Sequence, residues 1–344
     1  MALLYADSFD TYATADLTMR WTTVASGTIS STQSRNGGSA GKYTNTLGFT
    51  KGLNPATPAS GVLGIAMWSA PVQESYVTIG NSNGTQFVVQ RDGSDGSVKL
   101  EDNSNNVLQR SSAGVWNSEI WYYLEVKWTI ANSGGNVQVR INGATIIDYT
   151  GDTQYQSAAT WTTFSVGGIA TTSAGSYCDD LYICDQSGGV NDDFLGDVTV
   201  EALLPQTDAV APGSNASWTC GTGSDHGALV DEKPPYTADD TNDYVYTATL
   251  NAYDTWEYPS LTAATATIYA VQVATCAKKT DTGAATYVNV ARPASTNRDG
   301  GVTHSPSDSS YNYGIQVWDA NPEDSQPWEV ADVNGCEFGV KRTG

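Results

Sequence analysis

The chain has 344 residues, of which 40% are hydrophobic and 10% aromatic, so it has enough apolar material for one large or two medium domains. Sixteen basic and 37 acidic side chains give a formal charge of −21, so the protein repels phosphate groups and we expect no nucleic-acid partner. Runs of about 18 apolar residues are absent, which predicts no membrane span, and the first residues do not match a standard signal peptide.

Short alternating runs rich in Val, Ile, Thr, Tyr and Trp follow one another through the first half of the chain and predict β-strands. The clearest pair, at residues 121–130 and 136–141, is joined by an Asn-Ser-Gly-Gly turn. Further strands are expected at residues 61–68, 76–80, 86–90, 98–101, 164–167 and 181–185. Many short strands at this spacing are typical of a β-sandwich or jelly roll.

A polar, glycine-bearing segment at residues 186–193 is typical of a linker between domains. The charge balance also changes there, because residues 1–190 carry 9 basic and 15 acidic side chains and residues 191–344 carry 7 and 22. We therefore expect one domain at residues 1–190 and a smaller, acidic β domain at residues 191–344. In the second domain, strands are predicted at residues 194–205, 265–273, 285–290 and 335–341.

Four segments of the first half form a recognisable set: DSFDTY at residues 7–12, WYYLEVK at 121–127, VRING at 139–143 and DDLYI at 179–183. With these segments the first half resembles the concanavalin A-like (laminin-G-like) jelly roll. The resemblance implies that the first and last strands of the domain lie side by side. It would therefore bring Asp7 or Asp10 near Asp179 and Asp180.

Three segments of the second half extend the resemblance: NDDFLGDV at residues 191–198, IYAVQV at 268–273 and VNGCEFGVK at 333–341. They resemble segments of bacteriophage virion proteins in which a jelly roll precedes a second β domain. The resemblance implies an all-β fold, with a concanavalin A-like sandwich followed by a smaller β-sandwich-like domain. It also implies a structural role, such as a tail or neck fibre or a capsid decoration, and brings no catalytic residues with it.

Catalytic motifs are missing from the sequence, so we predict that the protein is not an enzyme. The E-x-D-x-x-E strand that places two carboxylates about 5 Å apart in some glycanases does not occur. Glu119 and Glu125 are too far apart along a strand to replace it, and Glu125 is interpreted as structural. His226 and His304 lie in polar sequence without a partner pattern, and no nucleophile elbow is present.

Calcium is the only ion that the sequence brings into consideration, and no other cofactor is expected. Asp7, Asp10, Asp179 and Asp180 could converge if the ends of the first domain pair, and Ca²⁺ prefers clustered oxygen ligands. The alternative, which we favour because no calcium-loop spacing supports the ion, is that these side chains cap turns or face water.

Aromatic side chains in loop-like sequence could contact sugars or other proteins, because their rings combine an apolar face with a polar edge. The alternative is that they fill the cores of the two domains. Candidates for a sugar platform are Trp116, Trp161, Trp218, Trp256 and Tyr258. Candidates for anchors in an oligomer interface are Trp318 and Trp328.

Together these features predict a non-enzymatic structural protein of a bacteriophage particle, made in the host cytoplasm and located in the virion. Its expected partners are other virion proteins of the capsid, neck or tail, and further copies of itself in a symmetric oligomer such as a trimer. The main alternative is an adhesin or receptor-binding module that contacts a host-surface glycan. A glycoside hydrolase is a third hypothesis, because the fold permits it.

Overall fold

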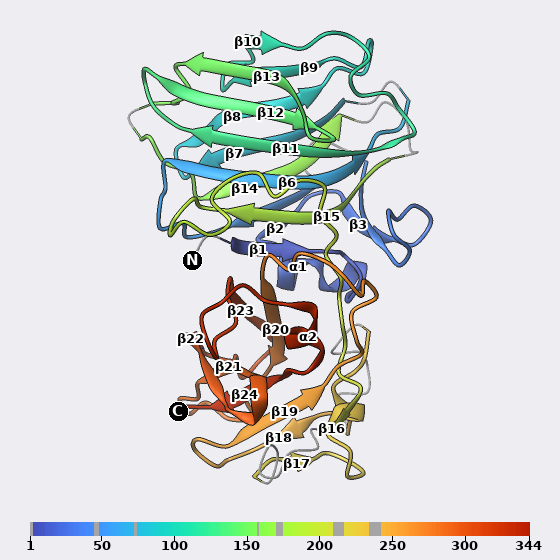
Figure 1. Cartoon of the computed structure of the whole chain (residues 1–344), viewed down its shortest axis with the longest axis vertical. Helices are drawn as coiled ribbons and strands as arrows, with labels where there is room; N and C mark the ends of the chain where they lie inside the picture. Colours follow the sequence, from blue (N-terminus) through green and yellow to red (C-terminus); the bar gives the residue numbers. More distant parts are fainter. Residues whose placement is uncertain are drawn as a thin grey trace. The chain divides into compact units, whose positions relative to one another are not determined.

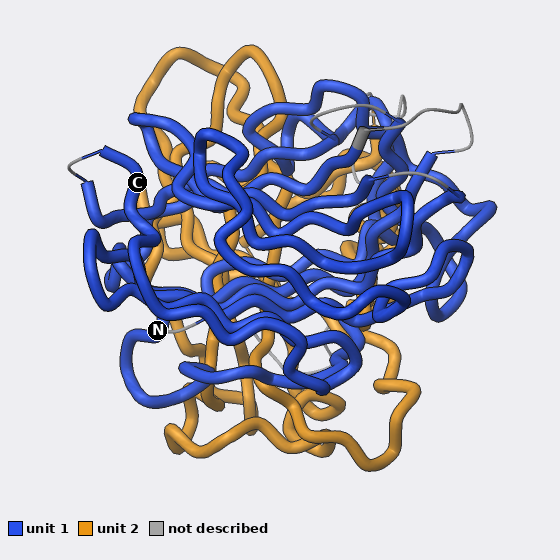
Figure 2. The backbone as a smooth tube through the Cα atoms, turned by 90° about the horizontal axis from the view of Figure 1, so that it is seen from above, with its two compact units in different colours: residues 1–200 blue, residues 201–344 orange. Residues whose placement is uncertain are grey.

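The computed structural model describes residues 3–44, 48–71, 74–156, 158–169, 175–208, 217–233 and 242–344. These residues form an almost all-β structure (Figure 1) with two compact units, residues 1–200 and residues 201–344 (Figure 2). The helical elements of the described part are short: α1 (Leu17–Arg20), α2 (Val330–Asn334) and the 3₁₀ turns η1 (Thr14–Asp16), η2 (Gly227–Leu229) and η3 (Pro293–Ser295). No helix in the described ranges is long and apolar enough to cross a membrane.

The larger sheet of the first unit has eight antiparallel strands in the order β13-β12-β11-β6-β15-β4-β3, with β1 also paired to β15. Its strands are β1 (Leu3–Asp7), β3 (Gly27–Ser30), β4 (Ala40–Tyr43), β6 (Ser60–Trp68), β11 (Trp121–Thr129), β12 (Gly135–Ile141), β13 (Ala144–Gly151) and β15 (Ser176–Cys184). The pairing of β1 with β15, in which Asp7 lies opposite Leu181, confirms that the first and last strands of this domain are neighbours.

The second sheet of this unit has seven antiparallel strands in the order β10-β9-β8-β7-β14-β5-β2. Its strands are β2 (Thr23–Val24), β5 (Phe49–Gly52), β7 (Glu74–Asn81), β8 (Gly84–Arg91), β9 (Val98–Asp102), β10 (Val107–Arg110) and β14 (Thr163–Ile169).

The core of the first unit lies between these two sheets. Alternate residues of β11, among them Leu124, Val126 and Trp128, are fully buried, as expected for a strand with one face in a core. The Trp128 ring meets Phe87 of the other sheet at 6.0 Å and Trp161 at 5.2 Å between ring centroids. The first unit is therefore a concanavalin A-like sandwich, and the eight strands predicted for it are present with shifted ends.

The second unit consists of smaller sheets. A five-stranded sheet has the order β16-β19-β24-β21-β22, and the pairs β17-β18 and β20-β23 form two further sheets. The strands of the second unit are β16 (Thr207–Asp208), β17 (Thr219–Cys220), β18 (Val245–Tyr246), β19 (Tyr253–Glu257), β20 (Val271–Ala277), β21 (Tyr287–Arg292), β22 (Arg298–His304), β23 (Asn312–Trp318) and β24 (Glu337–Arg342).

The division between the two units lies at Val200–Glu201, whereas the sequence placed it at residues 190–191. The strand predicted at residues 194–205 is wrong, because that segment has no strand pairing in the structure. Residues 193–200 instead lie on the first unit and bond to its side chains, as described below.

Candidate functional site

One face of the larger sheet points away from the core of the sandwich, and we call it the outer face. Residues that lie directly opposite each other on neighbouring strands share a face, and side chains alternate along each strand. Because Leu124 and Val126 are in the core, Trp121, Tyr123 and Glu125 of β11 belong to the outer face. Neighbouring strands add their own residues to this face.

Three aromatic side chains lie in register across one end of the outer face. Trp121 of β11 is opposite Trp68 of β6, which in turn is opposite Tyr177 of β15. The rings of Trp68 and Tyr177 meet edge to face, with centroids 5.4 Å apart, and the Lys42 ammonium is 5.8 Å from the Tyr177 ring centroid. We call Trp121, Trp68 and Tyr177 the aromatic row. Both tryptophans are partly exposed, whereas Tyr177 is 6% exposed.

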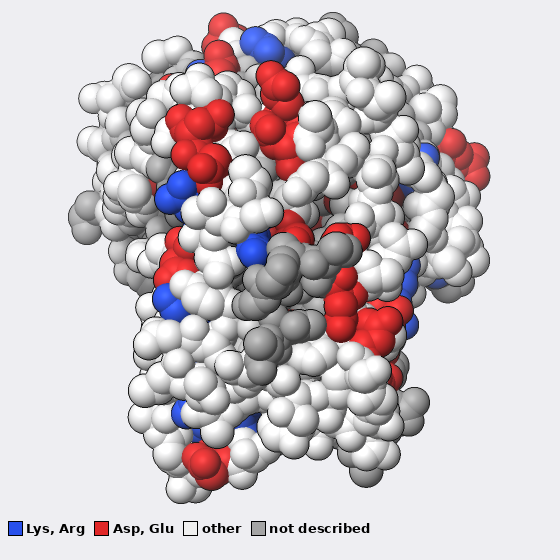
Figure 3. Space-filling model, turned by 60° about the horizontal axis from the view of Figure 1, so that its bottom comes forward, with Lys and Arg blue, Asp and Glu red and all other residues white. Residues whose placement is uncertain are grey.

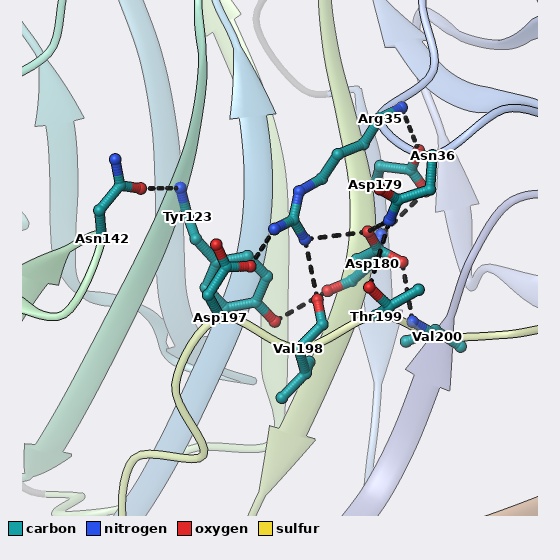
Figure 4. Close-up of polar contacts among 10 residues, drawn as sticks. All are labelled: Arg35, Asn36, Tyr123, Asn142, Asp179, Asp180, Asp197, Val198, Thr199 and Val200. Carbon is teal, nitrogen blue, oxygen red and sulfur yellow. Dashed lines mark hydrogen bonds and ion pairs between the residues drawn. The ribbon is translucent and has the colours of Figure 1, made fainter. Parts of the chain in front are cut away.

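A partly buried polar cluster surrounds Arg35 (Figure 4), and its residues Asp179 and Asp180 follow Tyr177 on β15. The Arg35 guanidinium donates to the Asp180 carboxylate at 3.0 Å and to the Val198 carbonyl at 2.8 Å, and it also bonds to Asp197. It lies 5.0 Å from the Tyr123 ring centroid, a cation–π distance. The Arg35 backbone N–H donates to Asp179 at 3.0 Å. Local sequence patterns do not reveal the role of Arg35, because it is 144 residues from Asp179 in the chain.

Two neighbouring carboxyl groups in this cluster have pKa values raised above the usual value for aspartate. Burial, reinforced by the adjacent Asp180 charge, raises the pKa of Asp179 to about 8. Burial also raises the pKa of Asp180, although the Val200 N–H and Arg35 act to lower it. At neutral pH the pair therefore tends to hold a proton, which limits the repulsion between the two adjacent carboxylates.

Residues 193–200 cover the part of the outer face beyond the aromatic row, and we call them the cover segment. The Phe194 ring lies 3.9 Å from the Arg140 guanidinium carbon, and Asp193 pairs with Lys127 at 3.0 Å. The Gly196 N–H donates to Glu125 at 2.8 Å. These contacts explain why Glu125 is 1% exposed although it lies on the outer face.

Backbone groups of the cover segment bond to side chains of the sheet. The Leu195 N–H donates to the Tyr182 hydroxyl at 3.1 Å, and the Val200 N–H donates to Asp180 at 2.8 Å. The Tyr182 hydroxyl in turn donates to Glu125 at 2.8 Å. The Tyr182 ring lies against Gly64, where a Cβ atom would overlap it, so glycine is required at that position of β6. The covered part of the face is therefore filled by the chain itself.

The four aspartates considered for calcium have hydrogen-bond donors from the protein. Asp7 accepts hydrogen bonds from the Tyr5 and Tyr12 hydroxyls at 2.5 and 2.7 Å, and Asp10 accepts one from the Ser39 N–H at 2.7 Å. Asp179 and Asp180 bond to Arg35. Among the described residues, no group of three or more His, Cys, Asp or Glu side chains could hold a metal ion. Of the four carboxylates, only Asp180 meets the Arg35 guanidinium, while the other three accept hydrogen bonds from tyrosine hydroxyls or backbone N–H groups.

Most of the aromatic residues that the sequence suggested as contact residues are core residues. Trp116 and Trp161 are 0% exposed, so they cannot form a sugar platform. Trp256 and Trp328, at 6% and 3%, are buried in clusters of the second unit. The remaining candidates, Trp218, Tyr258 and Trp318, are partly buried and pack against these same clusters. The predicted interface role of Trp328 is therefore corrected to packing, and its indole N–H donates to the Trp318 carbonyl at 3.0 Å.

Trp68 and Trp121 are not among the aromatic candidates from the sequence, although a signal for their exposure exists. Trp68 and Trp121 fall within predicted strands, and strand alternation from Leu124 and Val126 places Trp121 on the outer face. What the alternation does not give is the neighbour of each strand. That pairing, β11 with β6 and β6 with β15, brings the three rings of the aromatic row together.

His226, which has no partner pattern in the nearby sequence, is paired with a carboxylate in the structure. Its Nδ1 atom lies 2.8 Å from the Asp254 carboxylate, and both residues are buried. Burial raises the pKa of Asp254 to about 7, although His226 acts to lower it. His304, the other histidine, ends β22, and its ring centroid lies 5.1 Å from that of Tyr287. Glu119 has a φ of +61° just before β11, away from the buried Glu125 in the sheet.

No protein-family model and no curated protein matches this sequence. Among solved structures, galectin LEC-6 of Caenorhabditis elegans is similar, with 12% identity, 41% of this chain and 94% of that chain covered, and a TM-score of 0.31. A tetrameric galectin from the ball sponge Cinachyrella sp. has 16% identity, with 38% and 95% covered and a TM-score of 0.31. The alginate lyase Aly36B has 11% identity, with 53% and 95% covered and a TM-score of 0.34. These are distant similarities between sandwich domains.

Proposed function

We propose that this protein is a non-enzymatic binding protein whose first unit contacts carbohydrate through the aromatic row, and that it does so as part of a bacteriophage particle. The observation that carries the carbohydrate proposal is the alignment of Trp121, Trp68 and Tyr177 across three neighbouring strands of the outer face. An aromatic ring offers an apolar surface to the C–H face of a pyranose, while its edge and nearby polar groups take hydrogen bonds.

The position of the row also supports this proposal. Trp121 lies four residues before Glu125 on β11, which corresponds to about 13 Å along a strand. The cover segment contacts the sheet at Glu125, Lys127 and Arg140, and it reaches Asp180, three residues after Tyr177 on β15. The partly exposed tryptophans therefore form the aromatic part of this face beyond those contacts.

Two features favour binding without catalysis. Glu125, the carboxylate considered for hydrolysis, is 1% exposed and accepts hydrogen bonds from Tyr182 and Gly196, so a substrate cannot reach it without displacing the cover segment. Asp179 is 3% exposed and its two oxygens accept backbone hydrogen bonds from Arg35 and Asp180. We therefore expect no release of reducing ends from a panel of polysaccharides, and release that is lost in Glu125→Gln would contradict a non-catalytic role.

The particle setting rests on the sequence resemblance to bacteriophage virion proteins. On the face shown in Figure 3, acidic side chains form several separate groups and outnumber basic ones, in keeping with a net charge of −21. Like-charged copies repel each other, so an assembly needs well-fitted contacts. A symmetric homo-oligomer remains a prediction, and light scattering on the purified chain measures it. Labelling of intact particles with an antibody against the chain tests the virion location.

The carbohydrate proposal is tested by affinity electrophoresis through gels that contain individual polysaccharides, with a glycan array as a second measurement. We expect the wild-type chain to be retarded by at least one neutral or acidic polysaccharide. The substitutions Trp68→Ala and Trp121→Ala should each weaken binding by about tenfold, because each removes one stacking surface.

The matched control is Tyr246→Ala, which removes an aromatic side chain that is 51% exposed in the second unit. This variant should bind like the wild type. Folding of all variants is compared by circular dichroism and thermal unfolding. Equal retardation of wild type, Trp68→Ala and Trp121→Ala, or a lack of binding across the panel, would overturn the proposal.

A further inference from the structure

The line of residues that contains the aromatic row continues past Tyr177 onto two further strands. Lys42 of β4 lies opposite Tyr177 of β15, and Thr28 of β3 lies opposite Lys42. Directly opposed residues share a face of a sheet, so both side chains belong to the outer face. Trp121 is three strand spacings from Lys42, or roughly 14 Å. Three aromatic rings and a cation therefore lie in one line across the sheet.

Lys42 differs from the other three lysines of the first unit in having no ion pair or hydrogen bond from its ammonium group within the described part of the chain. Lys99 and Lys127 each form an ion pair with an aspartate, at 3.4 and 3.0 Å, and the Lys51 ammonium donates to a backbone carbonyl. The Lys42 ammonium instead lies 5.8 Å from the Tyr177 ring centroid. A cation–π contact leaves the N–H donors of an ammonium available to a ligand.

The Lys42 side chain also packs against the backbone that leads into β15. Gly175 has a φ of +74°, and a Cβ atom on it would lie 2.6 Å from the Lys42 Cε atom. The alkyl chain of Lys42 therefore lies against Gly175, while the residue as a whole remains partly exposed. Because this packing restricts the side chain before a ligand arrives, less conformational entropy is lost when the ammonium is held by a ligand.

This combination of groups favours a sugar that carries a negative charge. The tryptophan rings offer stacking surfaces to the C–H faces of any pyranose. A carboxylate or sulfate group on the sugar chain adds a hydrogen bond between ions at Lys42, which is shorter and stronger than one to a neutral hydroxyl. The Thr28 side chain is exposed beside Lys42, and its hydroxyl can donate to a second oxygen of the same anionic group.

The charge of the whole chain makes such a preference informative. With a net charge of −21 the protein repels polyanions at long range, so an acidic polysaccharide gains nothing from general attraction. The Arg35 guanidinium, the other cation described for this part of the face, is already bonded to Asp180 and Asp197. Glu119 is exposed, but it lies two residues before Trp121, at the end of the row away from Lys42. A preference for acidic over neutral sugars therefore needs Lys42.

We propose that the aromatic row and Lys42 form one binding site for an acidic polysaccharide, in which the rings of Trp68 and Trp121 stack on the sugar chain and Lys42 pairs with a carboxylate or sulfate group. This proposal rests on the carbohydrate function proposed for the row and adds the class of its ligand. The separation of Trp121 from Lys42 is longer than one pyranose ring, so the site fits a stretch of polysaccharide and not a single sugar.

The test is affinity electrophoresis of the full chain with matched pairs of polysaccharides. Polygalacturonate and its fully methyl-esterified form share one backbone and differ in the carboxylate, and dextran sulfate and dextran differ in the sulfate. We expect the wild-type chain to bind the acidic member of at least one pair about tenfold more tightly than the neutral member. The pair that shows the preference distinguishes carboxylate from sulfate. The preference should decrease as salt is added, because salt screens exposed charges.

Three variants test the role of Lys42. Lys42→Gln removes the charge and should abolish the preference while leaving binding of the neutral member unchanged, and Lys42→Arg should retain the preference. The matched control is Lys278→Gln, which makes the same change of charge in the second unit, where the Lys278 ammonium lies 4.9 Å from the Tyr311 ring centroid. This control should behave like the wild type. Thermal unfolding verifies that each variant is folded.

Equal binding of both members of each pair, with retardation that is reduced in Trp68→Ala, would overturn the proposed ligand class and leave the carbohydrate function of the row in place. A preference that persists in Lys42→Gln, or that is lost equally in Lys278→Gln, would contradict the role of Lys42. A lack of retardation by every probe would count against the row as a carbohydrate site, and this proposal would fail with it.

Discussion

Asp179 and Asp180 are consecutive residues of β15, and yet both side chains take part in the cluster around Arg35. In a regular strand their side chains would point to opposite faces. Here the register shifts between Asp179 and Tyr182, and Asp180 has a φ of +48°. The irregularity turns the Asp180 carboxylate to the same side as Asp179, where it meets Arg35, Asn36 and the Val200 N–H.

Substitutions of Asp180 should therefore show how much its charge and its backbone conformation each contribute to stability. Asp180→Ala removes the acceptor for three donors and should lower the free energy of unfolding by about 3 kcal/mol. Asp180→Gly removes the same carboxylate but tolerates a positive φ, so we expect it to be the more stable of the two by roughly 1 kcal/mol. Urea unfolding of the full chain measures both. An alanine variant as stable as the wild type would show that the cluster contributes nothing.

The cover segment shows how an extended stretch can be held without joining a sheet. Its sequence alternates like a strand, but its N–H groups at Leu195, Gly196 and Val200 donate to the side chains of Tyr182, Glu125 and Asp180. Backbone donors need partners wherever they are buried, and side chains of the outer face provide them here in place of a neighbouring strand. The segment therefore lies on the face of the sheet and belongs to the first unit, beyond the residues that look like a linker.

Limited proteolysis should distinguish the linker from the cover segment. Gly188 and Gly189 are exposed and have positive φ angles, so we expect the first cut there. After the cut the cover segment is covalently attached to the C-terminal fragment, but we expect it to stay docked on the N-terminal fragment. The fragments should therefore elute together from a native sizing column and separate under denaturing conditions.

The control variant weakens the docking of the cover segment and leaves Gly188 and Gly189 unchanged. Arg35→Ala combined with Phe194→Ala removes the guanidinium cluster and the ring over Arg140, so the nicked fragments should separate on the same column. First cuts within residues 60–150 would contradict the two-unit organisation. Nicked wild-type fragments that separate at once would contradict docking of the cover segment.

At the scale of the whole molecule, buried carboxyl groups in both units make stability depend on pH. The raised pKa values of Asp179, about 8, and Asp254, about 7, mean that each group binds its proton more tightly in the folded than in the unfolded chain. Their stabilising contribution is complete at low pH and is lost as the pH rises through 7 and 8. The lowered pKa of His304, caused by burial, acts in the opposite direction.

We expect the unfolding temperature to fall by several degrees between about pH 5 and pH 9, since roughly 2–4 °C corresponds to 1 kcal/mol in a domain of this size. The growing negative charge at high pH adds to the effect. Differential scanning calorimetry at constant ionic strength measures it. Asp254→Asn should flatten the dependence, because it removes one of the titrating groups. A wild-type unfolding temperature that rises steadily to pH 9 would contradict this assignment.

The sequence by itself determined the local features of this protein. Alternation along residues 121–130 and 136–141, with a glycine-rich turn between them, predicted the hairpin β11–β12 in its observed position. The resemblance of residues 7–12 and 179–183 to a jelly roll predicted the pairing of β1 with β15. These inferences succeed because strand periodicity and turn chemistry depend on neighbouring residues, and an all-β class follows from many such segments.

Only the tertiary structure decided which side chains can reach a ligand. The local sequence puts Trp116 in a loop, where exposure is expected, yet Trp116 is 0% exposed, whereas Trp121 on a strand is partly exposed on the outer face. The pairing of His226 with Asp254 and of Arg35 with Asp179 joins residues that are 28 and 144 positions apart. Exposure and partners of this kind depend on which strands become neighbours and on which segment covers each face, and these are set by packing across the whole unit.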